Sequence, residues 1–201
     1  MLDKSLKLCY LIMCKEDGHN YPIYELPDGY SFSMYSKGDE EKWAEVEISV
    51  GQFETLQEGV DCFNAQFNDQ TLKKEDRILF VKDASGKIVA TGAMWQGVFN
   101  GEIVERMHWI AVDDSCKGKG IAKAMVSELL NIYNRLNSKS IIYLITESWC
   151  YSAINIYLKF GFKPYYGDNP VEEFDFSNAE FIEQNEHGWS LVNQKINVYK
   201  K

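Results

Sequence analysis

The stretch RMHWIAVDDSCKGKGIAKAMVSELLNIYNRL, residues 106–136, determines the expected fold. Its apolar run 107–112 is typical of a strand, and the Asp-Asp-Ser sequence at 113–115 favours a break after it. Further along, apolar residues recur with the spacing of one helical face, at Ile121, Met125, Leu129, Ile132, Tyr133 and Leu136. The stretch therefore predicts a strand, a glycine-containing turn and a helix that ends near Asn137.

The turn Lys117-Gly118-Lys119-Gly120 suits a phosphate group. The first turn of a helix leaves backbone N–H groups without intrahelical partners, and the helix dipole places about half a positive charge there. Glycines let that backbone come close to a ligand. Without further support, two solvated turn lysines would explain Lys117 and Lys119 equally well.

Composition indicates a folded protein. With 201 residues, 45% hydrophobic and 14% aromatic, the chain suits one α/β domain. No apolar run approaches the ~18 residues of a membrane span, and the short run 8–14 is expected to be a strand and not a signal peptide. The five cysteines form no C-x-x-C pair, which is typical of free thiols in the cytoplasm. The three histidines share no ligand spacing with them, so no metal is expected.

The net charge of −9 is unevenly distributed. Residues 1–76 carry 7 Lys and Arg against 16 Asp and Glu, whereas residues 77–201 carry 14 of each. The acidic first part speaks against a nucleic-acid partner. Residues 117–163 carry 7 basic and 2 acidic side chains, which suits a small polyanion, although a solvated surface explains the same bias.

Local patterns predict the remaining elements. Expected strands are 6–14, 30–35, 77–82, 87–99, 102–112, 140–146 and 162–166, with hairpin turns at 83–86 and 100–101. Expected helices are 39–50 with Asp39 as N-cap, 55–67, 153–160 closed by Gly161, and about 178–197. The β-branched run 140–146 is predicted to be a buried parallel strand. We expect a domain over 1–170 and a helical extension, 171–201, packed on it.

Residues 117–122 resemble the R/Q-x-x-G-x-G/A phosphate loop of the GNAT acetyltransferase superfamily. The segment Ala153-x-x-x-Tyr157-x-x-x-Gly161-Phe162 resembles the second signature of that family. The similarity covers residues 77–166, preceded by the strand and two helices of 30–67. It implies a single domain with a mixed, mostly antiparallel twisted sheet flanked by helices. Two positions depart from the family pattern: Lys117 replaces the usual Arg or Gln, and Cys150 stands where Asn is frequent.

The resemblance implies acetyl-coenzyme A as cosubstrate, with no metal. Its pyrophosphate would lie on the loop amides and its pantetheine arm along the preceding strand, which in the family splays from the next strand. The residues implied in cofactor binding are Ile110, Ala111, Val112, Lys117, Gly118, Lys119, Gly120, Ile121 and Ala122.

The chemistry requires an acid and a base. A primary amine is protonated at pH 7, and removing its proton costs roughly 4.6 kcal/mol, so a base must accept that proton. The departing thiolate gains from a general acid, which by resemblance is Tyr157, although a packed core tyrosine is the alternative. Glu105 or His108 is the candidate base; three residues apart, they face opposite sides of a strand unless a bulge intervenes. Glu147 is a third candidate.

The predicted function is acetyl-coenzyme A-dependent N-acetyltransferase, an acyltransferase that passes acetyl directly to a primary amine. The acceptor, a small molecule or peptide, would lie between helices 39–67 and strand 102–112, and the acidic first part hints that it is cationic. We expect a cytoplasmic monomer or homodimer with no membrane or nucleic-acid partner. The alternatives are a non-catalytic acyl-coenzyme A sensor or scaffold and, last, a nucleotide-binding protein, since the loop lacks G-x-x-x-x-G-K-[ST].

Overall fold

The described part of the chain, residues 3–16 and 18–198 of a computed structural model, contains a seven-stranded sheet in the order β2-β3-β4-β5-β6-β1-β7. The strands are β1 Tyr10–Lys15, β2 Ser31–Met34, β3 Ile78–Lys82, β4 Ile88–Phe99, β5 Glu102–Val112, β6 Ile142–Glu147 and β7 Lys163–Pro164. The helices are α1 Glu40–Ser49, α2 Leu56–Gln66, α3 Lys74–Arg77, α4 Ile121–Arg135, α5 Tyr151–Lys159 and α6 Asn178–Val198, with 3-10 turns η1 Asp114–Cys116 and η2 Ser148–Cys150. The predicted mixed, mostly antiparallel α/β fold is confirmed.

The chain forms two compact units, and the strands β4 and β5 each contribute one part to either unit. The first unit comprises Ile23–Trp95 and His108–Leu136. The second comprises the described residues up to Pro22, Gln96–Met107, and those from Asn137 onward.

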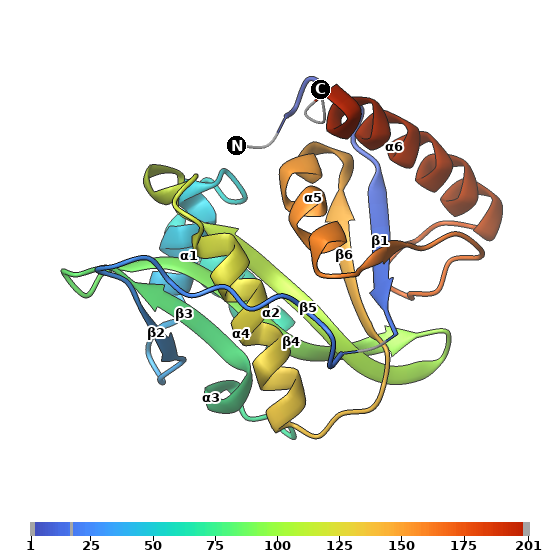
Figure 1. Cartoon of the computed structure of the whole chain (residues 1–201). Helices are drawn as coiled ribbons and strands as arrows, with labels where there is room; N and C mark the ends of the chain where they lie inside the picture. Colours follow the sequence, from blue (N-terminus) through green and yellow to red (C-terminus); the bar gives the residue numbers. More distant parts are fainter. Residues whose placement is uncertain (1–2, 17, 199–201) are drawn as a thin grey trace. The chain divides into compact units, whose positions relative to one another are not determined.

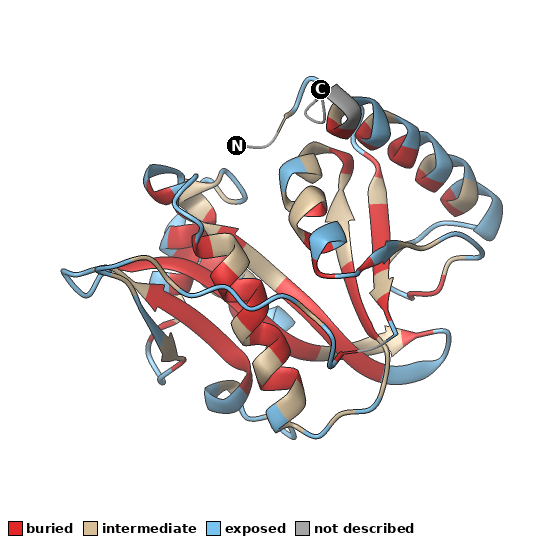
Figure 2. Cartoon of the chain, in the orientation of Figure 1, coloured by how far each residue is buried: buried red, intermediate tan, exposed pale blue. Residues whose placement is uncertain are grey.

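In the first unit, helices cover both faces of the sheet (Figure 1). β2, β3 and β4 pair antiparallel, and α4 lies against one face of them. Its approach is close at Gly92 of β4, where an added Cβ would lie 3.1 Å from Leu129 and 3.3 Å from Met125. The predicted apolar face of α4 is buried, as Figure 2 shows. α1 and α2 cover the opposite face, where alternate residues of β4 such as Ala93 and Trp95 join their apolar cluster.

The second unit is built around β6. As predicted, β6 is buried along its first half and runs parallel to β5, with Glu105 opposite Ile142 and Met107 opposite Leu144. On its other edge it pairs antiparallel with β1 along its whole length. The first strand of the chain thus lies between β6 and β7. Two strands differ from the expected bounds. The strand expected at 6–14 begins only at Tyr10, and the strand expected at 162–166 is the shorter β7, Lys163–Pro164.

The helix α6 packs on β1 within the second unit. The side-chain amide of Gln184 accepts a hydrogen bond from the Tyr10 N–H and donates one to the Tyr10 carbonyl, both at 2.8 Å. Gly188 permits close contact, because a Cβ there would lie 2.7 Å from the Cβ of Cys9. The helix expected at 178–197 is therefore present, and buried residues recur on one of its faces in successive turns (Figure 2).

Several predicted helix ends follow from local hydrogen bonds. Thr55 forms a capping box with Glu58 at the start of α2. Gly161 ends α5 with a φ of 85°, and the N–H groups of Gly161 and Phe162 donate to the carbonyls of Leu158 and Tyr157, both at 3.1 Å. This pair of bonds is the Schellman motif.

Asp39 occupies the predicted N-cap position of α1 without forming the cap bond. Its carboxylate accepts a hydrogen bond from the Ser36 N–H and pairs with Lys42, and these contacts take the place of the helix amides. The short helix α3 was not predicted; four residues carry too little periodicity to reveal one. Over the described residues, no helix has both the length and the apolar composition needed to cross a membrane.

Replacing Gly97 of β4 by Ala is expected to destabilise the second unit. A Cβ at this position would lie 2.0 Å from the Tyr143 hydroxyl oxygen and 3.1 Å from its ring carbon Cζ. Overpacking of this kind typically costs about 1–3 kcal/mol. The double variant G97A/Y143F should regain most of that loss in urea unfolding, because phenylalanine lacks the hydroxyl oxygen that lies closest to the new Cβ. Equal stability of G97A and wild type would contradict the packing.

Candidate functional site

The predicted phosphate loop is exposed and open above its backbone. Gly118 and Gly120 both have left-handed conformations, with φ of 78° and 91°. A Cβ built on either glycine meets no heavy atom within 4 Å. Side chains at these two positions would therefore fill free space directly above the loop, which is the space that a ligand bound by the backbone amides requires.

The loop leads straight into α4. Gly120 is the N-cap residue, and its carbonyl accepts hydrogen bonds from the N–H groups of Lys123 at 3.1 Å and Ala124 at 3.2 Å. The amides of Ile121 and Ala122 precede these first intrahelical bonds. The first turn contains no acidic residue, so the positive end of the helix dipole is not neutralised by its own side chains. The arrangement favours an anion.

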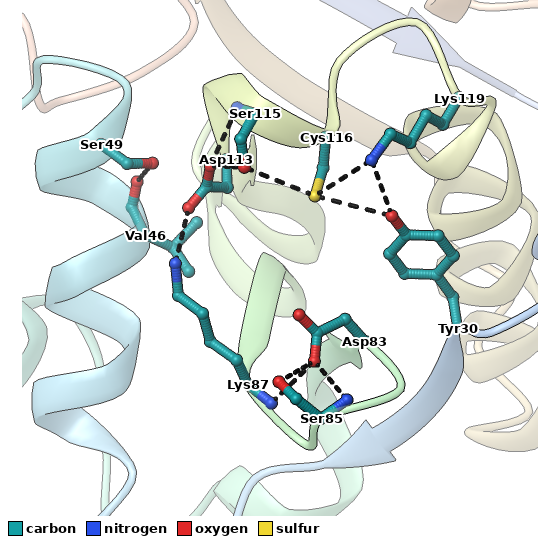
Figure 3. Close-up of polar contacts among 10 residues, drawn as sticks. All are labelled: Tyr30, Val46, Ser49, Asp83, Ser85, Lys87, Asp113, Ser115, Cys116 and Lys119. Atoms are coloured by element: carbon teal, nitrogen blue, oxygen red, sulfur yellow. Dashed lines mark hydrogen bonds and ion pairs between the residues drawn. The ribbon is translucent and has the colours of Figure 1, made fainter.

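A carboxylate fixes the turn before the loop (Figure 3). Asp113 Oδ1 accepts hydrogen bonds from the Ser115 hydroxyl at 2.6 Å and the Ser115 N–H at 2.9 Å. Its Oδ2 pairs with Lys87 Nζ at 3.2 Å. These contacts, with the Ser115 hydroxyl contributing most, hold the pKa of Asp113 below its ordinary value despite burial. The predicted break at 113–115 is therefore confirmed, and its cause is this side-chain turn.

The two loop lysines have partners within the first unit. Lys117 forms an ion pair with Asp114. Lys119 Nζ donates to the Tyr30 hydroxyl at 3.0 Å and lies 4.0 Å from Cys116 Sγ (Figure 3). The bond to Tyr30 raises the pKa of Lys119, so this ammonium keeps its charge. Both lysines supply positive charge beside the exposed glycines.

The strand predicted to hold a pantetheine arm is the end of β5. Its ladder with β6 covers Glu105 to Met107, and β5 then continues through Ile110, Ala111 and Val112. Ala111 is buried in the α1–α2 cluster, while Ile110 faces the opposite side, near Gly92. These side chains are therefore core groups, and a ligand here would use backbone groups.

Trp109 interrupts the regular pleat of β5. Its φ of 49° is unusual for a bulky residue and marks local strain. In a regular strand, neighbouring side chains point to opposite faces. Here both His108 and Trp109 contact the α1–α2 side: His108 lies 5.8 Å from Phe67 and Trp109 lies 5.2 Å from Trp43, between ring centroids. Trp109 therefore turns its side chain to the same side of the sheet as His108.

The two candidate bases have different surroundings. His108 is buried in the first unit, with its Nε2 at 2.9 Å from Gln66 Oε1 of α2. Glu105 is buried in the second unit, where Gln96 Nε2 donates to it at 3.3 Å. The expectation that Glu105 and His108 face opposite sides of the strand stays a prediction.

The second unit contains the candidate acid. Tyr157 lies on α5, is only 7% exposed, and stacks edge-on at 6.1 Å from Phe162. Burial raises its pKa well above the ordinary value, so its phenol stays protonated at neutral pH. Burial likewise raises the pKa of Glu147, and that of Cys150 to about 11. Cys150 therefore carries a thiol at neutral pH.

Glu47 is a buried acid that was not predicted as a site residue. This α1 residue is 1% exposed, and its Oε1 has no hydrogen-bond partner in the described structure. Burial raises its pKa to about 8. The signal was available: Glu47 lies four residues after Trp43 and three after Ala44, which places a carboxyl on the apolar face of the helix. Within the described ranges, no group of three or more His, Cys, Asp or Glu is arranged to hold a metal.

Comparison with known proteins identifies the family. Residues 33–162 match the model of the "Acetyltransferase (GNAT) family". The chain belongs to this family, as the loop and the Tyr157 segment predicted. No curated protein sequence matches the chain.

Solved structures of the same family share the fold. A GCN5-related N-acetyltransferase from Sphaerobacter thermophilus superposes with a TM-score of 0.58 at 19% identity over 79% of this chain and 49% of that one. A GNAT-family acetyltransferase from Colwellia psychrerythraea gives 0.57 at 15% identity over 79% and 53%. One from Kribbella flavida gives 0.51 at 13% over 79% and 55%. The chain thus spans about half the length of these structures, and the likeness concerns the fold.

The Glu47→Gln variant is expected to be more stable than wild type at high pH. The folded protein holds a proton on Glu47 up to about pH 8, whereas the ordinary value is 4.5, so the wild-type free energy of unfolding falls as pH rises through that window. The amide cannot ionise, and E47Q should gain on the order of a few kcal/mol relative to wild type by pH 9.

Urea unfolding of both proteins at pH 4.5 and pH 9 measures this difference. The exposed Glu45→Gln on the same helix is the matched control, since it removes the same charge without the burial. A constant difference between wild type and E47Q at the two pH values would show that Glu47 titrates normally.

Proposed function

We propose that the protein is an N-acetyltransferase that moves an acetyl group from acetyl-coenzyme A directly to a primary amine. Family membership supports acyl-coenzyme A-dependent transfer in general. The observation that carries the proposal is the exposed loop before α4, with two left-handed glycines and open space above both.

The loop fits the diphosphate of the donor. Amides from Gly118 to Ala122, the helix dipole and the ammonium of Lys119 would together bind the negative charge. The backbone of 110–112 would pair with the amides of the pantetheine arm, since β5 extends past its ladder with β6. When bound, acetyl-coenzyme A supplies the activated acyl group, and the chain contributes binding and proton transfer.

Buried side chains would carry out the proton transfers. We propose that the Tyr157 phenol donates a proton to the thiolate that leaves, because its raised pKa keeps it protonated across the neutral range. Glu105 or His108 would take the proton from the amine. Both are buried within hydrogen-bond range of an amide side chain, which would orient the base. The acceptor is a small-molecule or peptide amine.

A non-catalytic acyl-coenzyme A sensor is the second candidate function. The same loop would serve it, and the buried Tyr157, packed edge-on against Phe162, would then be a core residue. The two functions differ in whether Tyr157 matters for turnover or for packing alone.

Gly120→Ala should weaken donor binding by roughly 10- to 100-fold. The new Cβ enters the open space above the loop and displaces one charge-assisted hydrogen bond, worth about 1.5–3 kcal/mol. Calorimetric titration with coenzyme A measures the change. Gly86→Ala is the matched control, because Gly86 has a similar φ of 86°, also faces open space, and lies in the β3–β4 hairpin turn. Equal losses in both variants would indicate strain alone.

Tyr157→Phe should lower kcat by about 10²–10⁴-fold while leaving the affinity for coenzyme A unchanged. Phenylalanine keeps the ring against Phe162 and removes the donor. Thiol release from acetyl-coenzyme A in the presence of amines measures turnover, and calorimetry measures binding. Because the phenol pKa is raised, wild-type kcat should not fall between pH 8 and pH 10 from ionisation of Tyr157. Wild-type-like turnover by Y157F would contradict the assigned role.

A further inference from the structure

Three buried polar atoms lack hydrogen-bond partners in and beside one aromatic cluster of the first unit. They are Glu47 Oε1, Trp43 Nε1 and Trp109 Nε1. A buried polar group without a partner typically costs about 1–3 kcal/mol, and native proteins contain few of them. Three such groups associated with one cluster indicate that a polar ligand completes them.

The cluster has aromatic walls. The Trp43 ring centroid lies 5.2 Å from Trp109, 6.1 Å from Phe53 and 5.3 Å from Phe63. Phe53 lies 5.9 Å from Trp109. Aromatic faces attract cations, with Trp the strongest of the three rings.

Glu47 adjoins these walls. It follows Trp43 by one helical turn on the buried face of α1. Its charge also acts on Cys62 of α2, which packs against the same cluster and whose pKa is raised, first by burial and then by Glu47. The buried carboxyl and the rings thus belong to one region. Phe53, Cys62 and Trp109 are half-buried, so the region reaches the surface at one edge.

The strained backbone at Trp109 lies in the same region. Its left-handed φ turns the indole toward Trp43 instead of the α4 side of the sheet. Strain of this kind costs on the order of 1–3 kcal/mol and is concentrated at ligand sites. This observation is independent of the unpartnered polar atoms.

We propose that the cluster of Trp43, Phe53 and Trp109, together with Glu47, binds the amino group of the acceptor, and that the acceptor is a monoamine with an apolar body. On binding, Glu47 releases its proton to solvent and the ammonium pairs with the resulting carboxylate, while the rings enclose the apolar part. The inference rests on the proposed function and names the substrate class for its second site.

The chemistry favours a single charge. Glu47 is the buried acid of α1, whereas Glu41 and Glu45 of this helix are exposed. The titratable groups packed in the cluster, Cys62 of α2 and His108 of β5, are not carboxylates, and Glu54 beside Phe53 and Asp61 beside Cys62 are exposed to solvent. A polyamine would therefore bring further ammonium groups into an apolar region with no partner for them, which is costly. An arylalkyl amine such as 2-phenylethylamine has one ammonium and one ring.

Calorimetric titration of the full chain with 2-phenylethylamine, in the presence of coenzyme A, tests the proposal. Wild type and the control Glu45→Gln should bind with the same affinity, and Glu47→Gln should bind about tenfold or more weakly. The uncharged isostere 2-phenylethanol should bind weakly to all three, and spermidine should bind more weakly than 2-phenylethylamine. Because the amide is a neutral isostere of the protonated Glu47 carboxyl, E47Q is expected to fold.

The outcomes separate this inference from the proposed function. Equal affinity of wild type and E47Q for 2-phenylethylamine, or tighter binding of spermidine, overturns the inference, and acetylation of any amine would then leave the proposed function standing. Absence of acetyl transfer to every amine overturns the proposed function, whereas Glu47-dependent binding of 2-phenylethylamine would still support the amine site.

Discussion

The turn held by Asp113 is the contact on which the candidate donor site depends. One carboxylate accepts two hydrogen bonds from Ser115 and pairs with Lys87 of the neighbouring hairpin, and the Asp113 N–H donates to the Val89 carbonyl at 2.8 Å. The end of β5 is thereby tied to the start of β4. The chain then has only a few residues in which to reach α4, and two left-handed glycines make that short path possible. Without the fixed turn, the amides at the start of α4 would have no defined position relative to β5.

Features with a local cause were predictable from the sequence. The Thr55 capping box, the Asn100-Gly101 hairpin and the Gly161 helix end each depend on residues within about one turn of one another. The apolar spacing of α4 and the glycine loop belong to the same class, and together with the Tyr157 segment they were sufficient to indicate the family. Asp39 shows the limit of such signals: its position was right, but two nearby groups compete for its carboxylate.

Features with a long-range cause were not predictable. The insertion of β1 between β6 and β7 joins residues more than a hundred positions apart, and nothing in the run Tyr10–Lys15 specifies its partner. The contact of Gln184 with both backbone groups of Tyr10 depends on the same pairing. Trp109 is a third case, because nothing in the sequence marks a tryptophan with a left-handed backbone. That His108 and Trp109 contact the same side of the sheet is seen only in the folded structure, where α1 and α2 pack on that side.

Local rules fail most clearly at Glu47 and Trp109. A sequence specifies a fold when helix, strand and burial preferences agree, and departures from that agreement concentrate at functional sites. A carboxyl group on the buried face of α1 and a strained aromatic residue in β5 are both unfavourable where they stand, and both belong to the region around Trp43. The loop before α4 follows every local rule, because a bound diphosphate needs only backbone amides and space. An acceptor amine needs a buried charge and a shaped wall, and these cannot be built without cost to the folded protein. The proposed donor site could therefore be predicted from the sequence, while the proposed acceptor site became visible only through the unfavourable positions in the structure.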